Sequence, residues 1–335
     1  MVEALYYNKL EENMVRCVLC PHNCALSEGH YGICNSRKNI KGTLMATSYG
    51  NLCSLSVDPI EKKPLMNYLP GTTTYSISSA GCNFRCLQCQ NDGISQYKPE
   101  ERAVFKATPI HIVDNAINHG CKSISYTYTE PTTFYEFMLE TAQIANVHGL
   151  KNVMVSNGYI NEEPLRELCK YVHAFNIDLK YWSEVIYKKV SGGSLEPVLN
   201  TLKIIKENNC WLEITNLIIP GINDSTDMIR EMCDWLVDND FDKYPLHFSR
   251  FYPKYKLMET AWTPMDIMYE AKEVAKRAGM KYVYLGNVND EESSYIYCPS
   301  CSNDVIKRVG NELVENNIGM MGICNYCGEQ IDGVF

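Results

Sequence analysis

The sequence predicts an α/β protein in which a partial (β/α)6 barrel lies between two small cysteine-rich modules. Strand-like apolar runs alternate with segments of helical periodicity from residue 74 onwards, and this alternation is typical of a parallel sheet with right-handed crossovers. Eleven of the 16 cysteines fall in three tight groups, two of which flank the alternating region. We therefore expect an N-terminal cysteine-rich module with a connector at 1–73, the barrel at 74–290 and a zinc-ribbon-like or rubredoxin-like module at 291–335.

The composition is that of a globular protein with a hydrophobic core: 335 residues, 45% hydrophobic and 21% charged. The formal net charge of −9 argues against a nonspecific grip on nucleic-acid phosphates. The N-terminus has no apolar signal-peptide core, and the longest uncharged run, 64–84, is broken by Pro and Gly and is unsuited to a membrane span. Clustered cysteines in a chain of this size indicate metal rather than disulfides. We predict a cytoplasmic protein with no membrane partner and no indicated nucleic-acid partner.

The first group of cysteines lies among turn-forming Pro, Asn and Gly residues. These N-terminal cysteines are Cys17, Cys20, Cys24 and Cys34. Ligation by four cysteines suits both zinc and an iron–sulfur cluster, so we favour zinc here and keep an auxiliary iron–sulfur cluster as the alternative. His22 lies within the group but is expected outside the ligand set.

A proline-rich connector at 46–73 is expected to be ordered, and its Glu61, Lys62 and Lys63 to form a solvated charge run. The barrel strands are then expected at 74–80, 123–128, 152–156, 174–179, 211–219 and 246–251. Helices are expected to begin near residues 109, 134, 163, 197, 225 and 264. Thr108-Pro109 and Thr263-Pro264 supply an N-cap followed by Pro at the first helical position.

The second group of cysteines follows the first barrel strand, at the end where α/β barrels bind ligands. These central cysteines are Cys82, Cys86 and Cys89, in a C-x3-C-x2-C pattern. They supply three ligands and no fourth, whereas a structural zinc site uses four. Thiolates also hold iron–sulfur clusters, and a cluster with three cysteine ligands keeps one iron open. A zinc loop that borrows a distant ligand is the alternative.

Polar residues also follow or interrupt the next three strands. Thr127-Tyr-Thr-Glu-Pro131 follows the second strand, and Ser156-Asn-Gly158 follows the third. Asp178 and Lys180 interrupt the fourth strand two residues apart, so both side chains face the same way. Because a buried charge must be paired, we expect an Asp–Lys pair at the substrate end of the barrel.

The third group consists of two Cys-x2-Cys pairs in the tail. These C-terminal cysteines are Cys298, Cys301, Cys324 and Cys327. A tail of this length has too little core to fold without a ligand. We predict zinc, with a rubredoxin-like iron as the alternative.

The motifs together resemble one family over essentially the whole chain. They are Cys-x2-Cys-Pro-His-x-Cys at the start, Val57-Asp-Pro-Ile-Glu-Lys-Lys-Pro-Leu65, Gly81-Cys-Asn-Phe84, Tyr126-Thr-Tyr-Thr-Glu-Pro131 and the closing Cys-x2-Cys pairs. The chain resembles the radical S-adenosylmethionine (SAM) enzyme of the AmmeMemoRadiSam system, which is related to pyruvate formate-lyase and other glycyl-radical enzyme activating enzymes. The resemblance implies a TIM-like radical SAM partial barrel.

The resemblance also implies roles for the site residues. The central cysteines would hold a [4Fe-4S] cluster that binds SAM, and Glu130 would take the SAM amino group. Thr129 and Tyr128 stand where the family has two glycines, and Ser156 and Asn157 resemble its ribose-contacting segment. Asp178 and Lys180 resemble an activating-enzyme motif that helps to bind cofactor and polypeptide substrate. Gln88 departs from the family, where an aromatic residue is common.

The implied activity is reductive cleavage of SAM to a 5′-deoxyadenosyl radical, which abstracts hydrogen from an unidentified substrate. An activase that generates a glycyl radical on a partner enzyme is the alternative, and a non-catalytic iron–sulfur or zinc scaffold is a more distant one. The expected partners are a low-potential electron donor of the flavodoxin or ferredoxin type and Memo-like proteins.

Overall fold

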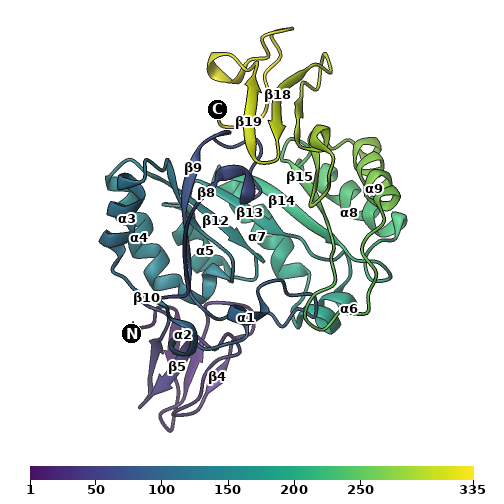
Figure 1. Cartoon of the computed structure of the whole chain (residues 1–335). Helices are drawn as coiled ribbons and strands as arrows, with labels where there is room; N and C mark the ends of the chain where they lie inside the picture. The colour runs from purple at the N-terminus through teal and green to yellow at the C-terminus, as the bar shows by residue number, and fades with distance from the viewer.

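The computed structural model describes residues 1–335. The centre of the protein is an eight-stranded sheet (Figure 1). Its strand order is β16-β15-β14-β13-β12-β11-β9-β8. The strands are β8 (Ser54–Pro59), β9 (Thr73–Ser78), β11 (Ser123–Tyr126), β12 (Lys151–Ser156), β13 (Ala174–Asp178), β14 (Trp211–Ile218), β15 (Leu246–Arg250) and β16 (Val283–Gly286). No pairing joins β8 to β16, so the sheet is open along that side.

The sheet has two strands more than the sequence predicts. β16 pairs in parallel with β15, and β8 pairs antiparallel with β9. The first was missed because it is four residues long and no helix follows it. The second was read as connector because it contains Asp58 and Pro59. Proline is tolerated there, since β8 is an edge strand.

Six helices follow the parallel strands and cover the outer side of the sheet (Figure 1). They are α3 (Pro109–Asn118), α4 (Tyr135–Val147), α5 (Glu162–Cys169), α7 (Glu196–Glu207), α8 (Thr226–Asp238) and α9 (Met265–Ala278). Three short helices lie in the loops: α1 (Asp92–Ser95), α2 (Pro99–Arg102) and α6 (Glu184–Ile186). α3 begins with Pro109 after Thr108, as predicted. No helix combines the length and apolar character that crossing a membrane would require.

The two cysteine-rich modules lie at opposite ends of the barrel (Figure 1). The N-terminal module has two small sheets, formed by β1 (Val2–Glu3), β2 (Tyr7–Lys9), β3 (Val15–Cys17), β4 (Ala25–Leu26), β5 (Arg37–Ile40) and β6 (Thr43–Ala46). β7 (Asn51–Leu52) pairs with β10 (Phe105–Lys106) beside it. The C-terminal module contains β17 (Ile296–Tyr297), β18 (Asp304–Val309) and β19 (Glu312–Asn316).

Contacts show which end of the barrel each module covers. Arg85, in the loop after β9, donates a hydrogen bond to the Ile33 carbonyl of the N-terminal module. That module therefore meets the carboxyl ends of the strands. Asn67 precedes β9, and its amide donates to the Asp332 carbonyl at 2.8 Å. The C-terminal module therefore meets the amino ends.

The modules also differ in their cores. Val15, Leu19 and Leu44 of the N-terminal module belong to one cluster of 63 buried residues that fills the barrel. The C-terminal module packs around a separate cluster of eight residues, of which six belong to the module and two, Tyr282 and Tyr284, to the barrel. The N-terminal module is thus an extension of the barrel core, whereas the C-terminal one is a small unit docked on the barrel.

The connector does not carry the solvated charge run that its sequence suggests. Glu61 and Lys63 are each 1% exposed, and of the three only the Lys62 side chain, 53% exposed, is in water. Arg308 of the C-terminal module contacts the Glu61 carboxylate at 3.3 Å, and the Lys63 ammonium lies 2.6 Å from Asp58. The sequence expectation is wrong here because Asp58 lies on the unpredicted strand β8 and because Arg308 comes from another module.

Candidate functional site

The central cysteines lie in the loop after β9, at the carboxyl end of the sheet. Main-chain bonds from Arg85 N to Ser191 O and from Leu87 N to Val190 O, 2.8 and 3.0 Å long, hold this loop in place. Gly81 starts the loop with φ +109°, and a Cβ there would lie 2.6 Å from the Cys34 carbonyl oxygen. Only glycine fits this position, because the N-terminal module presses directly on the loop.

Each central sulfur has a hydrogen-bonding neighbour. Cys82 Sγ accepts from Phe84 N at 3.3 Å, Cys86 Sγ lies 3.1 Å from Ser191 Oγ, and Cys89 Sγ lies 3.1 Å from Ser95 Oγ. Burial raises the pKa of the Cys82 and Cys86 thiols. Bound metal stabilises the thiolate form that burial disfavours. The three side chains therefore offer an oriented set of soft ligands.

The distances between sulfur atoms within a group differ from one cysteine group to another. The C-terminal cysteines form the one group of possible metal ligands in the chain whose ligand atoms all lie within 4.8 Å of one another. Two of their sulfur–sulfur distances are 3.6 and 3.8 Å. A tetrahedral ion with metal–sulfur bonds of about 2.3 Å has edges of about 3.8 Å. The C-terminal cysteines could therefore hold one metal ion.

The central cysteines are more widely spaced than this, as no group containing all three meets the 4.8 Å limit. In a cluster each cysteine binds a different iron, which spreads the sulfurs beyond the spacing of a single-ion site. Three cysteines with no fourth ligand therefore fit an iron–sulfur cluster with one open iron better than they fit a lone zinc ion.

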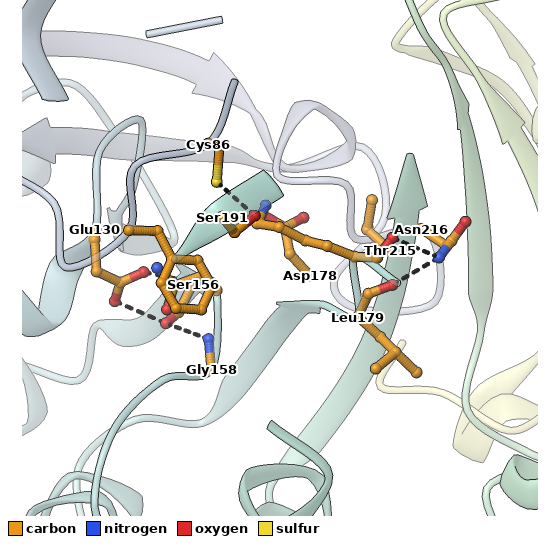
Figure 2. A network of polar contacts seen from close by, with 12 residues as sticks. Cys86, Glu130, Ser156, Gly158, Asp178, Leu179, Ser191, Thr215 and Asn216 are labelled. Atoms are coloured by element: carbon orange, nitrogen blue, oxygen red, sulfur yellow. Dashed lines mark hydrogen bonds and ion pairs between the residues drawn. The ribbon is translucent and has the colours of Figure 1, made fainter. Parts of the chain in front are cut away.

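Glu130 joins the ends of β11 and β12. Its Oε1 accepts from Thr132 N, Thr132 Oγ1 and Ser156 Oγ at 3.0, 2.7 and 2.8 Å, and its Oε2 accepts from Asn157 N at 2.9 Å. Figure 2 shows the contact between Glu130 and Ser156. Burial raises the pKa of the Glu130 carboxyl, and these hydrogen bonds act in the opposite direction. Asn157 Nδ2 also lies 3.9 Å from Cys82 Sγ, so Glu130, Ser156 and Asn157 gather beside the central cysteines.

Thr129 is turned towards the first barrel strand. Its hydroxyl donates to the Ser79 carbonyl at 2.6 Å and lies 2.8 Å from Ser78 Oγ. The preceding residue, Tyr128, has φ +67°, and its hydroxyl donates to Asp58. The segment that resembles a glycine motif is therefore fixed in the structure by side chains that glycine lacks.

Asp178 and Lys180 form the pair that their spacing predicts. Lys180 Nζ lies 2.7 Å from Asp178 Oδ2. The Asp178 side chain is 33% exposed and the Lys180 side chain 18% exposed. Asn223, in the loop after β14, donates to the Lys180 carbonyl at 2.9 Å. Figure 2 shows Asp178 close to Cys86 and Ser191. The pair thus lies at the carboxyl end of the sheet, on the same side as the central cysteines.

The sequence reasoning missed a second charged group, formed by Asp58, Lys63 and Tyr128. Lys63 Nζ lies 2.6 Å from Asp58 and 4.7 Å from the centre of the Tyr128 ring. Burial lowers the pKa of Lys63 to about 8. The available signal was the alternation of Ser54, Ser56 and Asp58, which places three polar side chains on one face of a strand.

Two further buried contacts were not anticipated. Gln88, at the position where the family commonly has an aromatic residue, donates to the Tyr181 hydroxyl. Arg37 of the N-terminal module is buried against Glu136 of α4. No local sequence pattern indicates either contact, because the partners lie 93 and 99 residues away along the chain.

Comparison with known proteins agrees with this geometry. The family model described as the Radical SAM superfamily matches residues 76–236. The protein MJ0808 of Methanocaldococcus jannaschii, described as uncharacterized, is 47% identical over 333 residues, or 99% of each chain. The 4-hydroxyphenylacetate decarboxylase activating enzyme of Clostridium scatologenes is 22% identical over 165 residues, and the match spans 48% of this chain and 51% of that enzyme.

A solved structure supports the fold. Streptococcus suis SuiB bound to S-adenosylmethionine superimposes with a TM-score of 0.50 at 13% identity, over 69% of this chain and 53% of that chain. Together with the cysteine loop at the carboxyl end of the sheet, these matches place the protein in a family. The chain belongs to the radical SAM superfamily, whose members are enzymes that bind an iron–sulfur cluster and S-adenosylmethionine.

Proposed function

We propose that the chain uses a [4Fe-4S] cluster on Cys82, Cys86 and Cys89 to cleave SAM reductively. The resulting 5′-deoxyadenosyl radical would abstract hydrogen from a substrate at the carboxyl ends of the strands. One observation carries the proposal: the central cysteines, the group around Glu130 and the Asp178–Lys180 pair lie at one end of one sheet. Ligands of α/β folds bind at that end.

The residues around Glu130 support a site for the SAM amino group. Glu130 Oε2 accepts one hydrogen bond inside the protein, from Asn157 N, and a carboxylate oxygen has capacity for another. An ammonium group would complete its bonding. The Ser156 hydroxyl donates to Glu130 and accepts from Gly158 N at 3.0 Å. We propose that Ser156 and Thr129 orient the two loops, while Glu130 and Asn157 face the cofactor.

The cofactor supplies the bond-breaking electron, and the protein supplies position. Cys82, Cys86 and Cys89 would hold the cluster, which would supply one electron for the reductive cleavage of SAM. Lys180 and Asp178 are partly exposed and already paired, so they can exchange their mutual contact for contacts with a carboxylate or ammonium of the bound molecules. We propose that this pair positions cofactor or substrate.

The remaining assignments extend the proposal to metals and partners. We propose zinc for the C-terminal cysteines, on the strength of their tetrahedral spacing. A low-potential electron donor of the flavodoxin or ferredoxin type would reduce the enzyme. The motif Val57–Leu65 supports membership of the AmmeMemoRadiSam group, and with it a Memo-like partner.

A second candidate function is the activation of a glycyl-radical enzyme. It is favoured by the match to the 4-hydroxyphenylacetate decarboxylase activating enzyme and by a 27% identical match over 89 residues to the choline trimethylamine-lyase activating enzyme of Oleidesulfovibrio alaskensis. In that case the hydrogen donor would be a glycine of a partner protein. Either function would release 5′-deoxyadenosine, whereas a non-catalytic scaffold would release none.

The test is anaerobic turnover of the reconstituted protein with SAM and dithionite. We expect 5′-deoxyadenosine from the wild-type chain, and Cys86→Ala should lose both this product and about four irons. The matched control is Cys53→Ser, which changes a half-buried cysteine outside all three groups and should retain both. Release of 5′-deoxyadenosine by Cys86→Ala would refute the ligand assignment. A glycyl radical signal on an added partner enzyme would identify the activase function.

A further inference from the structure

The N-terminal cysteines differ from the C-terminal cysteines in the spacing of their sulfurs. Both groups have four cysteines, yet only the C-terminal set gathers within 4.8 Å. Not even three of the N-terminal sulfurs meet that limit. A single zinc ion requires every sulfur pair to lie about 3.8 Å apart, because each metal–sulfur bond is about 2.3 Å. The N-terminal arrangement is therefore too open for one ion.

The four sulfurs nevertheless belong to a common site. Cys17, Cys20, Cys24 and Cys34 all line one cavity. Leu19 and Ile33 contribute apolar walls, and Asn83 of the central loop and Thr132 and Thr133 line its barrel side. The four thiols face one space, yet they stay farther apart than the 4.8 Å limit of the C-terminal group, which favours a ligand with several metal ions over a single ion. In a [4Fe-4S] cluster each cysteine binds a different iron.

Two of the sulfurs have polar neighbours of the kind that tune a cluster. The Ser36 hydroxyl donates to Cys34 Sγ at 3.2 Å, and Arg37 Nη1 approaches Cys17 Sγ at 3.7 Å. Arg37 is 1% exposed, and it is held by Glu136 and by a 2.7 Å bond to the Leu5 carbonyl. Hydrogen bonds and positive charge near the sulfurs favour the reduced form of an iron–sulfur centre.

The N-terminal cavity adjoins the central cysteine loop. Asn83 lines the cavity and directly follows Cys82 in the chain. Its carbonyl oxygen lies 2.7 Å from His22 Nε2, and His22 stands between Cys20 and Cys24. One hydrogen bond and a few covalent bonds therefore connect a ligand of one group to a ligand of the other.

We propose that the N-terminal cysteines hold a second [4Fe-4S] cluster, adjacent to the central site and able to exchange electrons with it. This assignment reverses the preference for zinc that the sequence alone suggests, and it holds whichever substrate the enzyme uses. An electron from a low-potential one-electron protein donor would enter at the N-terminal cysteines and pass to the central ones. The donor is oxidised by one electron, and the N-terminal centre returns to its oxidised state.

The decisive experiment removes the central site and counts what remains. The triple variant Cys82→Ala, Cys86→Ala, Cys89→Ala is reconstituted anaerobically and analysed for iron, sulfide and zinc, with Mössbauer spectra. We expect about four irons and about four sulfides per chain with the spectrum of a [4Fe-4S] cluster. A zinc ion in the N-terminal module, or a two-iron spectrum, would overturn the proposal.

Wild-type protein and a reciprocal variant complete the test. The wild type should contain about eight irons, and Cys20→Ser, Cys24→Ser should lose about half of them. The matched control Cys301→Ser, Cys324→Ser should retain all the iron. Electron paramagnetic resonance of the reduced wild type should show the two spins interacting, with broadening that disappears in either single-cluster variant. About four irons and two zinc ions in the wild type would refute the second cluster. The triple variant keeps the proposal testable even where the N-terminal variant fails to fold.

Discussion

The two cysteine-rich modules each contain four cysteines, but they are packed differently against the barrel. The N-terminal module shares the 63-residue core of the barrel and presses on the central loop at Gly81. The C-terminal module packs around a small cluster of eight residues, two of which come from the barrel, and it lies at the amino ends of the strands. A module without a sufficient core depends on its metal for folding. We therefore expect metal to control stability at the C-terminal end of the barrel, whereas the cluster proposed at the N-terminal end would serve electron transfer.

Metal removal should therefore have its largest structural effect at the C-terminal end. Structural zinc contributes about 10–16 kcal/mol in isolated zinc-finger peptides, and a module with so small a core depends on such a contribution. Cys301→Ala should abolish the hydrogen-exchange protection of β18 and β19 and leave β9 to β15 protected. Cys20→Ser should leave the protection of β5 and β6 largely in place, because they pack on the barrel core. Protection of β18 that survives Cys301→Ala would remove this contrast.

Buried arginine–glutamate pairs join both modules to the rest of the chain and allow a matched comparison. Arg308 and Glu61 have side chains that are 0% exposed, and those of Arg37 and Glu136 are 2% and 6% exposed. Removing one partner of a buried pair costs about 3–5 kcal/mol, so Arg308→Met and Arg37→Met should each lower the free energy of unfolding in urea. Arg37→Met should also shift the potential of the N-terminal centre. An unchanged potential would mean that Arg37 is purely structural.

The Asp178–Lys180 pair should give a smaller effect on stability and a larger one on turnover. Its side chains are partly exposed, so each single variant, Asp178→Asn or Lys180→Met, should cost about 1.5–3 kcal/mol, the range for a hydrogen bond to a charged group. The double variant should regain stability, because no orphan charge remains, while 5′-deoxyadenosine release stays low. Thermal melts beside turnover assays test this. If the double variant recovered both stability and 5′-deoxyadenosine release, the pair would have a purely structural role.

The smallest effect is expected for Lys62, on the exposed side of the connector. Lys62 and Lys63 both pair with Asp58, at 2.8 and 2.6 Å, but their side chains are 53% and 1% exposed. Lys62→Met should change the free energy of unfolding by about 0.2–1 kcal/mol, as for an exposed ion pair. Lys63→Met should cost clearly more, since it leaves a buried carboxylate with one partner fewer. Equal costs in urea unfolding would show that the interior near Asp58 is hydrated.

Local patterns predicted most of the barrel and the membership of each cysteine group. The start of α3 at Pro109 was predictable from capping residues, and the strand Ala174–Asp178 from an apolar run. Both signals are properties of neighbouring residues. The Asp178–Lys180 pair was also predictable, because the two residues lie two apart in sequence at the end of one strand. These features need no knowledge of distant contacts.

The remainder depended on partners far away in the chain. Glu61 read as a surface charge because Arg308 lies 247 residues downstream. The sequence indicated only that Glu130 could bind a ligand. It could not show that three hydrogen bonds already reach one oxygen of its carboxylate, one of them from Ser156 on the next strand. The arrangement of the sulfurs was likewise hidden, since Cys-x2-Cys spacing is the same in the N-terminal and C-terminal groups while the folded sulfur distances differ.

The burial of Arg37 against Glu136 sets an order for biosynthesis. Residues 1–46 leave the ribosome long before α4 (Tyr135–Val147) is made, so the nascent N-terminal module lacks the helix against which Arg37 and Tyr6 pack. The packing of this module is therefore completed only after roughly the first third of the barrel has been translated. A cluster proposed for this module could therefore be bound early only by a partly packed module, whose Arg37 still lacks its carboxylate partner.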